Sequence, residues 1–366
     1  MIYKQNWKNR SPEFRKQVLL NKANKRWRRN HRRKNKHSRI SQEVKEQIRA
    51  AILKRTFSDY RFITAPYNFS LSDNEERALI FLRKIKTSYD YGEKVLVRLD
   101  KVKSISNDAI LLLMSTMVQF FTAGIKFNGT KPYKKSVKKK IEKSGFYNYL
   151  TGQTFAIRDQ YSFNNMESML YTHGQKRVDP NLANDIVRYS STFVWGNPRR
   201  CQGVQKTLLE LMHNTYDHAD RHKGEKHWWL SVEQDKDKRE VTIAFIDFGV
   251  GIFRSLKNKK ADEPLYGALE NLISRFPGVR TESEILRLIL EGKIRRTQSR
   301  KYNRGKGLSK IHTLYKENKI SSLVMVSNNA FAHLDNDDFH ELTDEFMGTF
   351  ISFKINQNTV SLPWIA

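Results

Sequence analysis

Two side chains four residues apart, Glu210 and Asn214, have the types and the spacing that could hold a divalent metal ion and activate a water. On a helix they project from the same face, one turn apart. The opposite face of such a helix carries a mostly apolar stripe: Val204, Leu208, Leu211, Met212, Thr215 and Ala219. An ordinary surface helix with a solvated polar side gives the same pattern, so the two residues need support from elsewhere in the chain.

An aspartate followed by two glycines gives that support. In Asp247-Phe-Gly-Val-Gly251 the acid ends an apolar segment, and Gly249 and Gly251 permit a bend and the close approach of a flat ligand. The Asp247 carboxylate can accept a hydrogen bond from an exocyclic amine such as that of adenine. The motif indicates a site for a nucleotide base at the end of a strand.

A second glycine motif, Arg304-Gly-Lys-Gly-Leu308, stands directly before a segment with helical periodicity. Glycines at a helix entrance let backbone amides face phosphate oxygens, and the helix N-terminus adds a partial positive charge. The two glycines of this motif are Gly305 and Gly307. The chain has no Gly-x-Gly-x-x-Gly after a first strand, no Walker A sequence and no His-Arg-Asp loop. These absences argue against the Rossmann, P-loop and protein-kinase types of nucleotide site.

The elements that position these residues are predicted from apolar periodicity and turn signals. The predicted strands are Trp228–Glu233, Glu240–Ile246, Leu323–Val326 and Gly348–Ile355, and the predicted helices are Glu284–Glu291 and Ser309–Tyr315. The segment from Lys293 to Arg304 carries six cations and no acid, as a flexible basic loop does.

The order of the motifs resembles that of the GHKL ATPases. Glu-x-x-x-Asn, Asp-x-Gly-x-Gly, Gly-x-Gly-Leu and a terminal Gly-Thr strand follow one another within residues 178–358. The superfamily includes gyrase-type topoisomerases, MutL proteins, sensor histidine kinases and anti-sigma serine kinases. The resemblance implies a Bergerat-type α/β sandwich over residues 178–366 that binds ATP and Mg²⁺ beneath a mobile lid. The segment from Ile252 to Arg304 would be this lid, and one of its cations could reach a phosphate when it closes.

The same resemblance implies a role for each matching residue. Glu210 corresponds to the general base of the hydrolysing branches, and Asn214 to the Mg²⁺ ligand. Asp247 would hold the adenine, in a pocket shaped by Gly249 and Gly251. The remaining implied ATP-binding residues are Gly305, Lys306, Gly307 and Leu308 at the phosphates and Thr349 on the terminal strand.

Residues 62–155 alternate strands and helices in a way that predicts a small α/β domain with a partly parallel sheet. The segments Asn68–Leu71, Val95–Asp100, Asp108-Ala109, Gly129–Pro132 and Ser144–Tyr147 resemble the STAS-like domains, relatives of anti-sigma-factor antagonists. The resemblance implies a protein-interaction or scaffold role. The loop Ser104–Asp108 lacks the Asp-Ser-Ser-Gly sequence of the antagonists, so regulatory phosphorylation is not expected. Residues 156–177 are expected to form a linker region.

Residues 1–60 contain 19 Lys and Arg and four acids. The excess of these cations over the acids is about half of the chain's formal net charge of +29. We expect a basic arm, partly helical or disordered, with a helix from Glu43 to Lys54. Residues 1–40 could bind nucleic acid, since Lys and Arg neutralise phosphates, and Trp7 and Trp27 could stack on unpaired bases. A solvated arm that improves solubility or docks on an acidic protein is the alternative.

The single cysteine, Cys201, excludes an internal disulfide and fits a reducing, cytoplasmic setting. No secretory signal or membrane span is expected, because the longest uncharged run, Ala109 to Ile125, is short and contains polar residues.

Three functions follow from these expectations. The first is an ATP-binding, ATP-hydrolysing switch whose lid closure is relayed to the STAS-like domain and the basic arm. The others are a serine protein kinase of the anti-sigma type and a nucleotide-sensing scaffold without turnover. A sensor histidine kinase is disfavoured, because none of the ten His residues has an acid next to it and a Pro four positions on. Dimerisation and a role in stress signalling or anti-phage defence would each fit the resemblance.

Overall fold

The structure is a computed structural model of the chain. It describes residues 42–144, 146, 168–173, 178–218, 228–257, 268–293 and 307–363, with residues 11, 13, 21–22 and 24–26. The chain divides into two compact units between Tyr60 and Arg61. Two expected site residues, Gly305 and Lys306, and most of residues 1–40 lie outside the described residues. None of the described helices combines the length and hydropathy that a membrane span requires.

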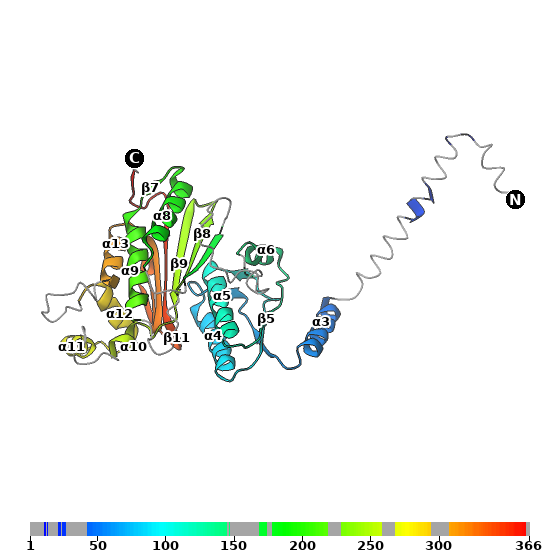
Figure 1. Cartoon of the computed structure of the whole chain (residues 1–366), viewed down its shortest axis with the longest axis horizontal. Coiled ribbons are helices and arrows are strands. Elements are labelled where there is room, and N and C mark those ends of the chain that lie inside the picture. Colours follow the sequence, from blue (N-terminus) through cyan, green and yellow to red (C-terminus); the bar gives the residue numbers. More distant parts are fainter. Residues whose placement is uncertain are drawn as a thin grey trace. The chain divides into compact units, whose positions relative to one another are not determined.

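The described part of the first unit is chiefly one helix. α3 spans Gln42–Thr56, where the sequence predicts a helix from Glu43 to Lys54. Its apolar residues Val44, Ile48 and Ile52 are four residues apart and exposed. The helix is drawn in blue in Figure 1.

Residues 61–144 open the second unit with two small parallel sheets. The strands are β1 (Arg61–Thr64), β2 (Asn68–Phe69), β3 (Val95–Arg98), β4 (Ser104–Ile105) and β5 (Phe127–Gly129). One sheet has the order β1-β3-β5, and β2 pairs with β4 in the other. The helices are α4 (Glu75–Asp90), α5 (Asn107–Thr122) and α6 (Lys135–Lys143). The predicted mixed α/β fold with parallel strand pairing is therefore present.

α5 is buried along most of its length. Ser106 caps the start of the helix, and its Oγ accepts the backbone N–H of Ala109 at 3.4 Å. Its residues from Asn107 to Met117 are all buried, which is expected of a helix that lies between two layers rather than on a surface.

A larger, five-stranded sheet is antiparallel and has the strand order β10-β11-β9-β8-β6. Its strands are β6 (Ser168–His173), β8 (Trp228–Asp235), β9 (Glu240–Asp247), β10 (Ser321–His333) and β11 (Asp338–Ile355). β6 lies within residues 156–177, where a linker is expected, and pairs with β8 at the edge of the sheet. Two short strands, β7 (Arg199–Arg200) and β12 (Leu362–Pro363), pair with each other outside this sheet. A 3₁₀ turn, η1 (Leu334–Asn336), lies between β10 and β11 in the chain.

Two strands are longer than the sequence predicts. The prediction places strands at Leu323–Val326 and Gly348–Ile355, whereas β10 and β11 extend over 13 and 18 residues. The polar residues from Ser327 to Asn329 interrupt the apolar pattern of β10. The register between β10 and β11 shifts at these positions, so the two strands continue to pair beyond them through an irregular register.

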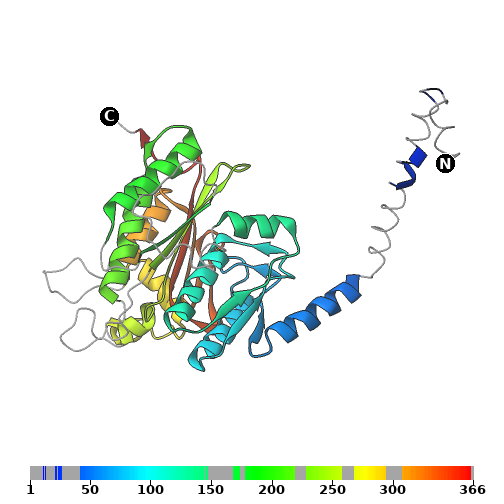
Figure 2. The same cartoon turned by 45° about the vertical axis from the view of Figure 1, so that its right-hand side comes forward.

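Helices from two parts of the chain cover the two faces of this sheet. One face, which we call the site face, is covered by α8 (Pro180–Trp195), α9 (Gln202–His218), α12 (Glu282–Leu290) and α13 (Gly307–Lys316). α4 and α5 cover the opposite face, which we call the back face. Figures 1 and 2 show the sheet between these two groups of helices. α10 (Ile252–Lys257) and α11 (Ala268–Arg275) lie at one end of the sheet.

Successive residues of the central strands point into different hydrophobic cores. In β9, Val241, Ile243 and Phe245 belong to the core of the site face. Ala244 and Ile246 belong to the core that the sheet shares with β1, β3, α4 and α5. This alternation follows from the two-residue period of a strand. Residues 61–144 therefore share a hydrophobic core with the five-stranded sheet.

The expected lid is in part a packed layer. Thr281 caps α12 through a capping box with Glu284, and Leu286 and Leu290 of this helix are buried in the core of the site face. In this structure α12 therefore belongs to the packed cover of the sheet. The lid interpretation of residues 252–304 stays a prediction, and residues 258–267 and 294–306 lie outside the described residues.

Candidate functional site

α9 and α13 lie side by side and run in opposite directions. Near one end of the pair, a Cβ added to Gly203 would come within 2.6 Å of Lys319, just beyond α13. Near the other end, a Cβ added to Gly307 would lie 3.0 Å from Glu210 Oε2 and 3.3 Å from the Asn214 amide atoms. Glycine at position 307 thus lets the start of α13 approach the two polar side chains of α9.

The structure brings together three of the predicted site residues, Glu210, Asn214 and Gly307. The first backbone N–H groups of a helix lack partners within the helix, so the start of α13 supplies donors and partial positive charge at this point. Glu210 and Asn214 supply a carboxylate and an amide oxygen. Leu308, expected to contact phosphates, is partly buried and packs against the core of the site face.

Lys310 is a member of this cluster that the motifs do not identify. Its Nζ donates to Glu210 Oε1 in an ion pair, and the two side chains are 49% and 24% exposed. Lys310 is three residues beyond Gly307, so both lie on the same face of α13. That spacing is the sequence signal that could have identified it.

Asp247 ends β9 and is almost fully buried. It is paired in register with Thr349 of β11. Its Oδ1 accepts the Gly249 N–H at 2.9 Å. Burial raises the pKa of Asp247 to about 6, against the lowering effect of hydrogen bonds from Gly249 and from the backbone and side chain of Thr349. The predicted residues Asp247, Gly249 and Thr349 are therefore neighbours.

Gly348 allows this close pairing. Its φ is +124°, and an added Cβ would lie 2.0 Å from the carbonyl oxygen of Asp247. Any side chain at this position would push β11 away from the end of β9. The Gly-Thr sequence of the terminal strand thus has a packing reason that is independent of any ligand.

Asn328 holds the backbone of the Asp-x-Gly-x-Gly loop. Its Oδ1 accepts the Phe253 N–H at 3.0 Å, and its Nδ2 donates at 3.0 Å to Val250 O and to Glu345 Oε1. Asn328 is fully buried and has a φ of +50°. An added Cβ at Gly251, where φ is +78°, would lie 2.4 Å from Asn328 Oδ1. Because glycine has no Cβ, Gly251 lets the loop approach Asn328 this closely.

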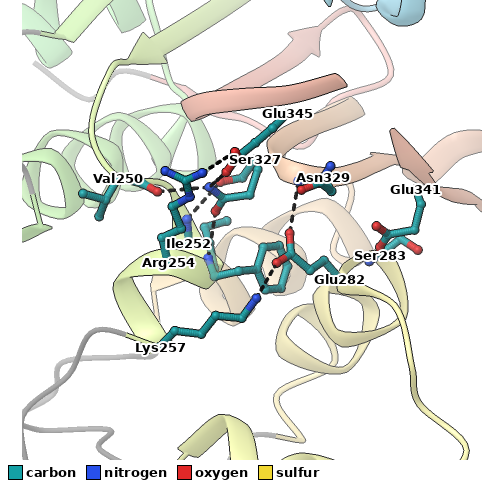
Figure 3. A network of polar contacts seen from close by, with 12 residues as sticks. Val250, Ile252, Arg254, Lys257, Glu282, Ser283, Ser327, Asn329, Glu341 and Glu345 are labelled. Carbon is teal, nitrogen blue, oxygen red and sulfur yellow. Dashed lines mark hydrogen bonds and ion pairs between the residues drawn. The ribbon is translucent and has the colours of Figure 1, made fainter. Parts of the chain in front are cut away.

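Polar contacts extend this loop to α10, α12 and β11 (Figure 3). The Ser327 hydroxyl accepts the Ile252 N–H at 2.9 Å and donates to Gly348 O at 2.8 Å. Arg254 of α10 pairs with Glu345 of β11. Lys257 pairs at 3.0 Å with Glu282, which also accepts the Asn329 N–H at 3.1 Å.

The two halves of the candidate site lie at one end of the sheet. β9 ends at Asp247 and leads into α10, and the C-terminal end of α9 reaches the same end of the sheet (Figure 1). A flat base at Asp247 and phosphates at the start of α13 would fit this arrangement. Gly305 and Lys306, expected at the phosphates, lie outside the described residues.

The described residues fit a Mg²⁺ ion that arrives with phosphates. Within the described ranges, no three His, Cys, Asp or Glu side chains form a cluster that could hold a metal ion by themselves. Mg²⁺ commonly uses one or two protein oxygens and takes its remaining ligands from phosphates and water. Asn214 could supply such an oxygen beside the glycine that opens the approach to α13.

Comparison of the chain with protein-family models finds no match, and a search of curated proteins finds no significant relative.

Proposed function

We propose that the chain is an ATP-binding switch of the GHKL type that hydrolyses ATP with Mg²⁺. One observation carries this proposal: the start of α13 lies so near Glu210 and Asn214 that a Cβ added at Gly307 would come within 3.0 and 3.3 Å of their side-chain atoms. These residues come from motifs almost one hundred positions apart in the chain. Their meeting is expected of a phosphate site and is not required by an ordinary amphipathic helix.

In the proposed site each residue has a distinct task. Asp247 accepts a hydrogen bond from the adenine amine, and Thr349 orients the Asp247 carboxylate. The N–H groups of α13 and the Lys310 ammonium balance the charge of the phosphates. Glu210 orients a water and accepts its proton. Asn214 would hold part of the coordination shell of a Mg²⁺ ion, which would supply further positive charge beside the phosphates.

The back face supports a route by which the nucleotide state reaches residues 61–144. Glu345 of β11 bonds to Asn328, which holds the Asp-x-Gly-x-Gly loop. The preceding residue, Asp344, pairs at 2.6 Å with Arg83 of α4. The N–H and hydroxyl of Thr343 add a second link, since they donate to Glu76 of the same helix at 3.2 and 3.1 Å. We propose that this STAS-like part responds to ATP and, with residues 1–40, engages a protein or nucleic-acid partner.

Steady-state phosphate release, measured beside equilibrium binding of a fluorescent ATP analogue, tests the proposal. Glu210→Gln should keep binding and lower the turnover rate by about 10²–10⁴-fold, the usual contribution of a general base. Asn214→Ala should lose Mg²⁺-dependent binding. Glu270→Gln, an exposed acid of α11, is the matched control and should change neither quantity.

Different outcomes contradict different parts of the proposal. Unchanged turnover in Glu210→Gln would remove this residue as the base. ATP binding without phosphate release would leave the non-hydrolysing scaffold. Transfer of labelled phosphate to a serine would instead identify a kinase of the anti-sigma type. A wild-type chain that does not bind ATP would refute the nucleotide site itself.

A further inference from the structure

The carboxyl ends of β1, β3 and β5 lie at one edge of their parallel sheet, and each leads into a loop that carries lysine or tyrosine. We call this region the carboxyl edge and define it by six residues. Tyr67 follows β1, Lys101 and Lys103 follow β3, and Lys131, Tyr133 and Lys134 follow β5. Ligands of open α/β sheets commonly bind at this end of the strands.

Backbone hydrogen bonds join the three loops. The Lys103 N–H donates to Tyr67 O at 2.7 Å, and the Tyr133 N–H donates to Asp100 O at 3.1 Å. Thr130 Oγ1 accepts the N–H groups of Leu99 and Asp100 at 2.8 and 3.1 Å. The side chains of the carboxyl edge are therefore presented by loops that are tied to one another.

The carboxyl edge is exposed and positively charged. Tyr67 and Tyr133 are 61% and 44% exposed, and the four lysines are also exposed. The loops that bear these residues contain one acid, Asp100, which is 4% exposed and accepts hydrogen bonds from Arg98 at 2.8 and 3.2 Å. Its charge is turned inward and neutralised by Arg98.

α6 continues this positive surface. It begins at Lys135, directly after Lys134, and has no acid in its first turn. Cations at a helix N-terminus oppose the helix dipole, so this arrangement costs stability unless an anion lies nearby. Further along the helix, Lys138 and Lys140 pair with Glu142 at 3.8 Å and with Glu233 at 2.6 Å.

We infer that the carboxyl edge binds single-stranded nucleic acid. Its lysines can neutralise phosphates, and its two exposed tyrosine rings can stack on unpaired bases. A purely acidic protein segment or an anionic membrane would use the charge but would have no need for both rings. The inference does not rest on ATP binding, and it places a nucleic-acid contact on residues 61–144 in addition to the one proposed for residues 1–40.

Fluorescence anisotropy of labelled oligouridine and oligothymidine, each of about 15 nucleotides, tests this surface in the full chain. Lys103→Gln with Lys134→Gln should reduce the dependence of log K on log salt by up to about 1.4, or about 0.7 for each phosphate that is no longer neutralised. Tyr67→Ala should weaken binding roughly fivefold or more at constant salt, because one base can no longer stack on a ring. Tyr67→Phe, which keeps a ring, should restore the affinity.

The controls distinguish binding at the carboxyl edge from general charge attraction and from binding by residues 1–40. Lys236→Gln with Lys238→Gln removes two lysines from the β8–β9 turn, and Tyr91→Ala removes a tyrosine that is 77% exposed before β3. Neither change should affect binding. The inference is overturned if the controls weaken binding equally or if the carboxyl-edge variants leave it unchanged. Displacement by polyglutamate or anionic vesicles as effective as that by unlabelled oligonucleotide would overturn it too. Residues 1–40 are unchanged in every variant. If they do not bind nucleic acid, the expected differences in affinity between the variants still hold.

Discussion

The two faces of the five-stranded sheet are equally well buried but are covered by different parts of the chain. Trp228 and Trp229 are adjacent in β8, each is 3% exposed, and they belong to opposite cores. Trp228 packs beneath the helices that follow residue 178. Trp229 packs with α4 and α5, which precede the sheet in sequence.

The candidate site is confined to one of these faces and its end. Glu210, Asn214 and Lys310 lie on the helices of the site face, whereas the back face is sealed by the apolar and partly polar contacts of α4 and α5. A sheet with one face assigned to a ligand site and one to a neighbouring α/β part can pass a change between them through its strands. The comparison therefore predicts that stability is shared across both faces, while the proposed nucleotide chemistry depends on one.

Truncation of a buried isoleucine on each face should give the largest effect. Ile243 and Ile246 of β9 are both fully buried, the first in the site-face core and the second in the back-face core. Each change to Ala should lower the free energy of unfolding by about 2–5 kcal/mol, because it removes buried methyl groups and leaves a cavity. Urea unfolding followed by tryptophan fluorescence and circular dichroism measures both costs.

The shape of these unfolding curves tests whether residues 61–144 share a hydrophobic core with the five-stranded sheet. Both variants should retain a single transition in which the two probes coincide, because α4 and α5 lose their packing when the sheet unfolds. A separate early transition in Ile246→Ala alone would show that residues 61–144 fold independently of the sheet.

Asp247→Asn should reveal the cost of a buried charge at the end of the site face. Because the folded pKa is raised from 3.8 to about 6, the folded chain binds more protons than the unfolded chain between these values. The free energy of unfolding therefore falls as pH rises from about 4 to 6, by about 3 kcal/mol in all, and this loss persists above pH 6.

The asparagine variant lacks this titration. Relative to wild type it should be more stable at pH 8, by up to about 3 kcal/mol, and similar in stability near pH 3.5. If the proposed adenine contact is right, it should at the same time bind ATP more weakly. Thermal unfolding at both pH values and nucleotide binding at pH 8 measure the two effects. Equal stability at pH 8 would show that Asp247 is ionised without cost.

The sequence predicts the local elements of both faces better than their assembly. The helix around Glu210, the hairpin that ends at Asp247 and the alternation over residues 62–155 follow from residue periodicity, which depends on neighbours in the chain. The cover of the back face depends on contacts between distant segments. A signal was present, because β9 is apolar at consecutive positions from Ile243 to Ile246, as in strands buried on both faces.

The site shows the same division. The motifs identify Glu210, Asp247 and Gly307, but Asn328 follows no recognised pattern. Its role depends on a positive φ and on a shift of register between β10 and β11, both of which arise from tertiary pairing. The polar interruption of an apolar strand at Ser327 to Asn329 is the only trace of this arrangement in the sequence.

Gly251→Ala should separate the strain of the Asp-x-Gly-x-Gly loop from the ordinary cost of a positive φ. Gly251 and Gly196 have similar φ values of +78° and +80°. A Cβ added to Gly251 would collide with Asn328, whereas a Cβ added to Gly196 would have no atom within 4 Å. Gly196→Ala should cost about 1 kcal/mol and Gly251→Ala about 2 kcal/mol. Urea midpoints measure both costs, and equal values would mean that Asn328 moves aside.

The ion pair between Arg83 and Asp344 joins the cover of the back face to β11, and its removal should have the smallest effect. The Asp344 side chain is 7% exposed, and its Oδ2 makes no hydrogen bond within the described part of the chain. Arg83→Met should cost about 1 kcal/mol, because it leaves a buried carboxylate without its partner while the exposed arginine gains little from the pair. Lys86→Met, one turn further along α4, removes an exposed pair with Asp90 and should cost less than about 0.5 kcal/mol. If both changes have the same small effect in urea unfolding, Asp344 is compensated in another way, and the Arg83–Asp344 ion pair does not help to hold the back face.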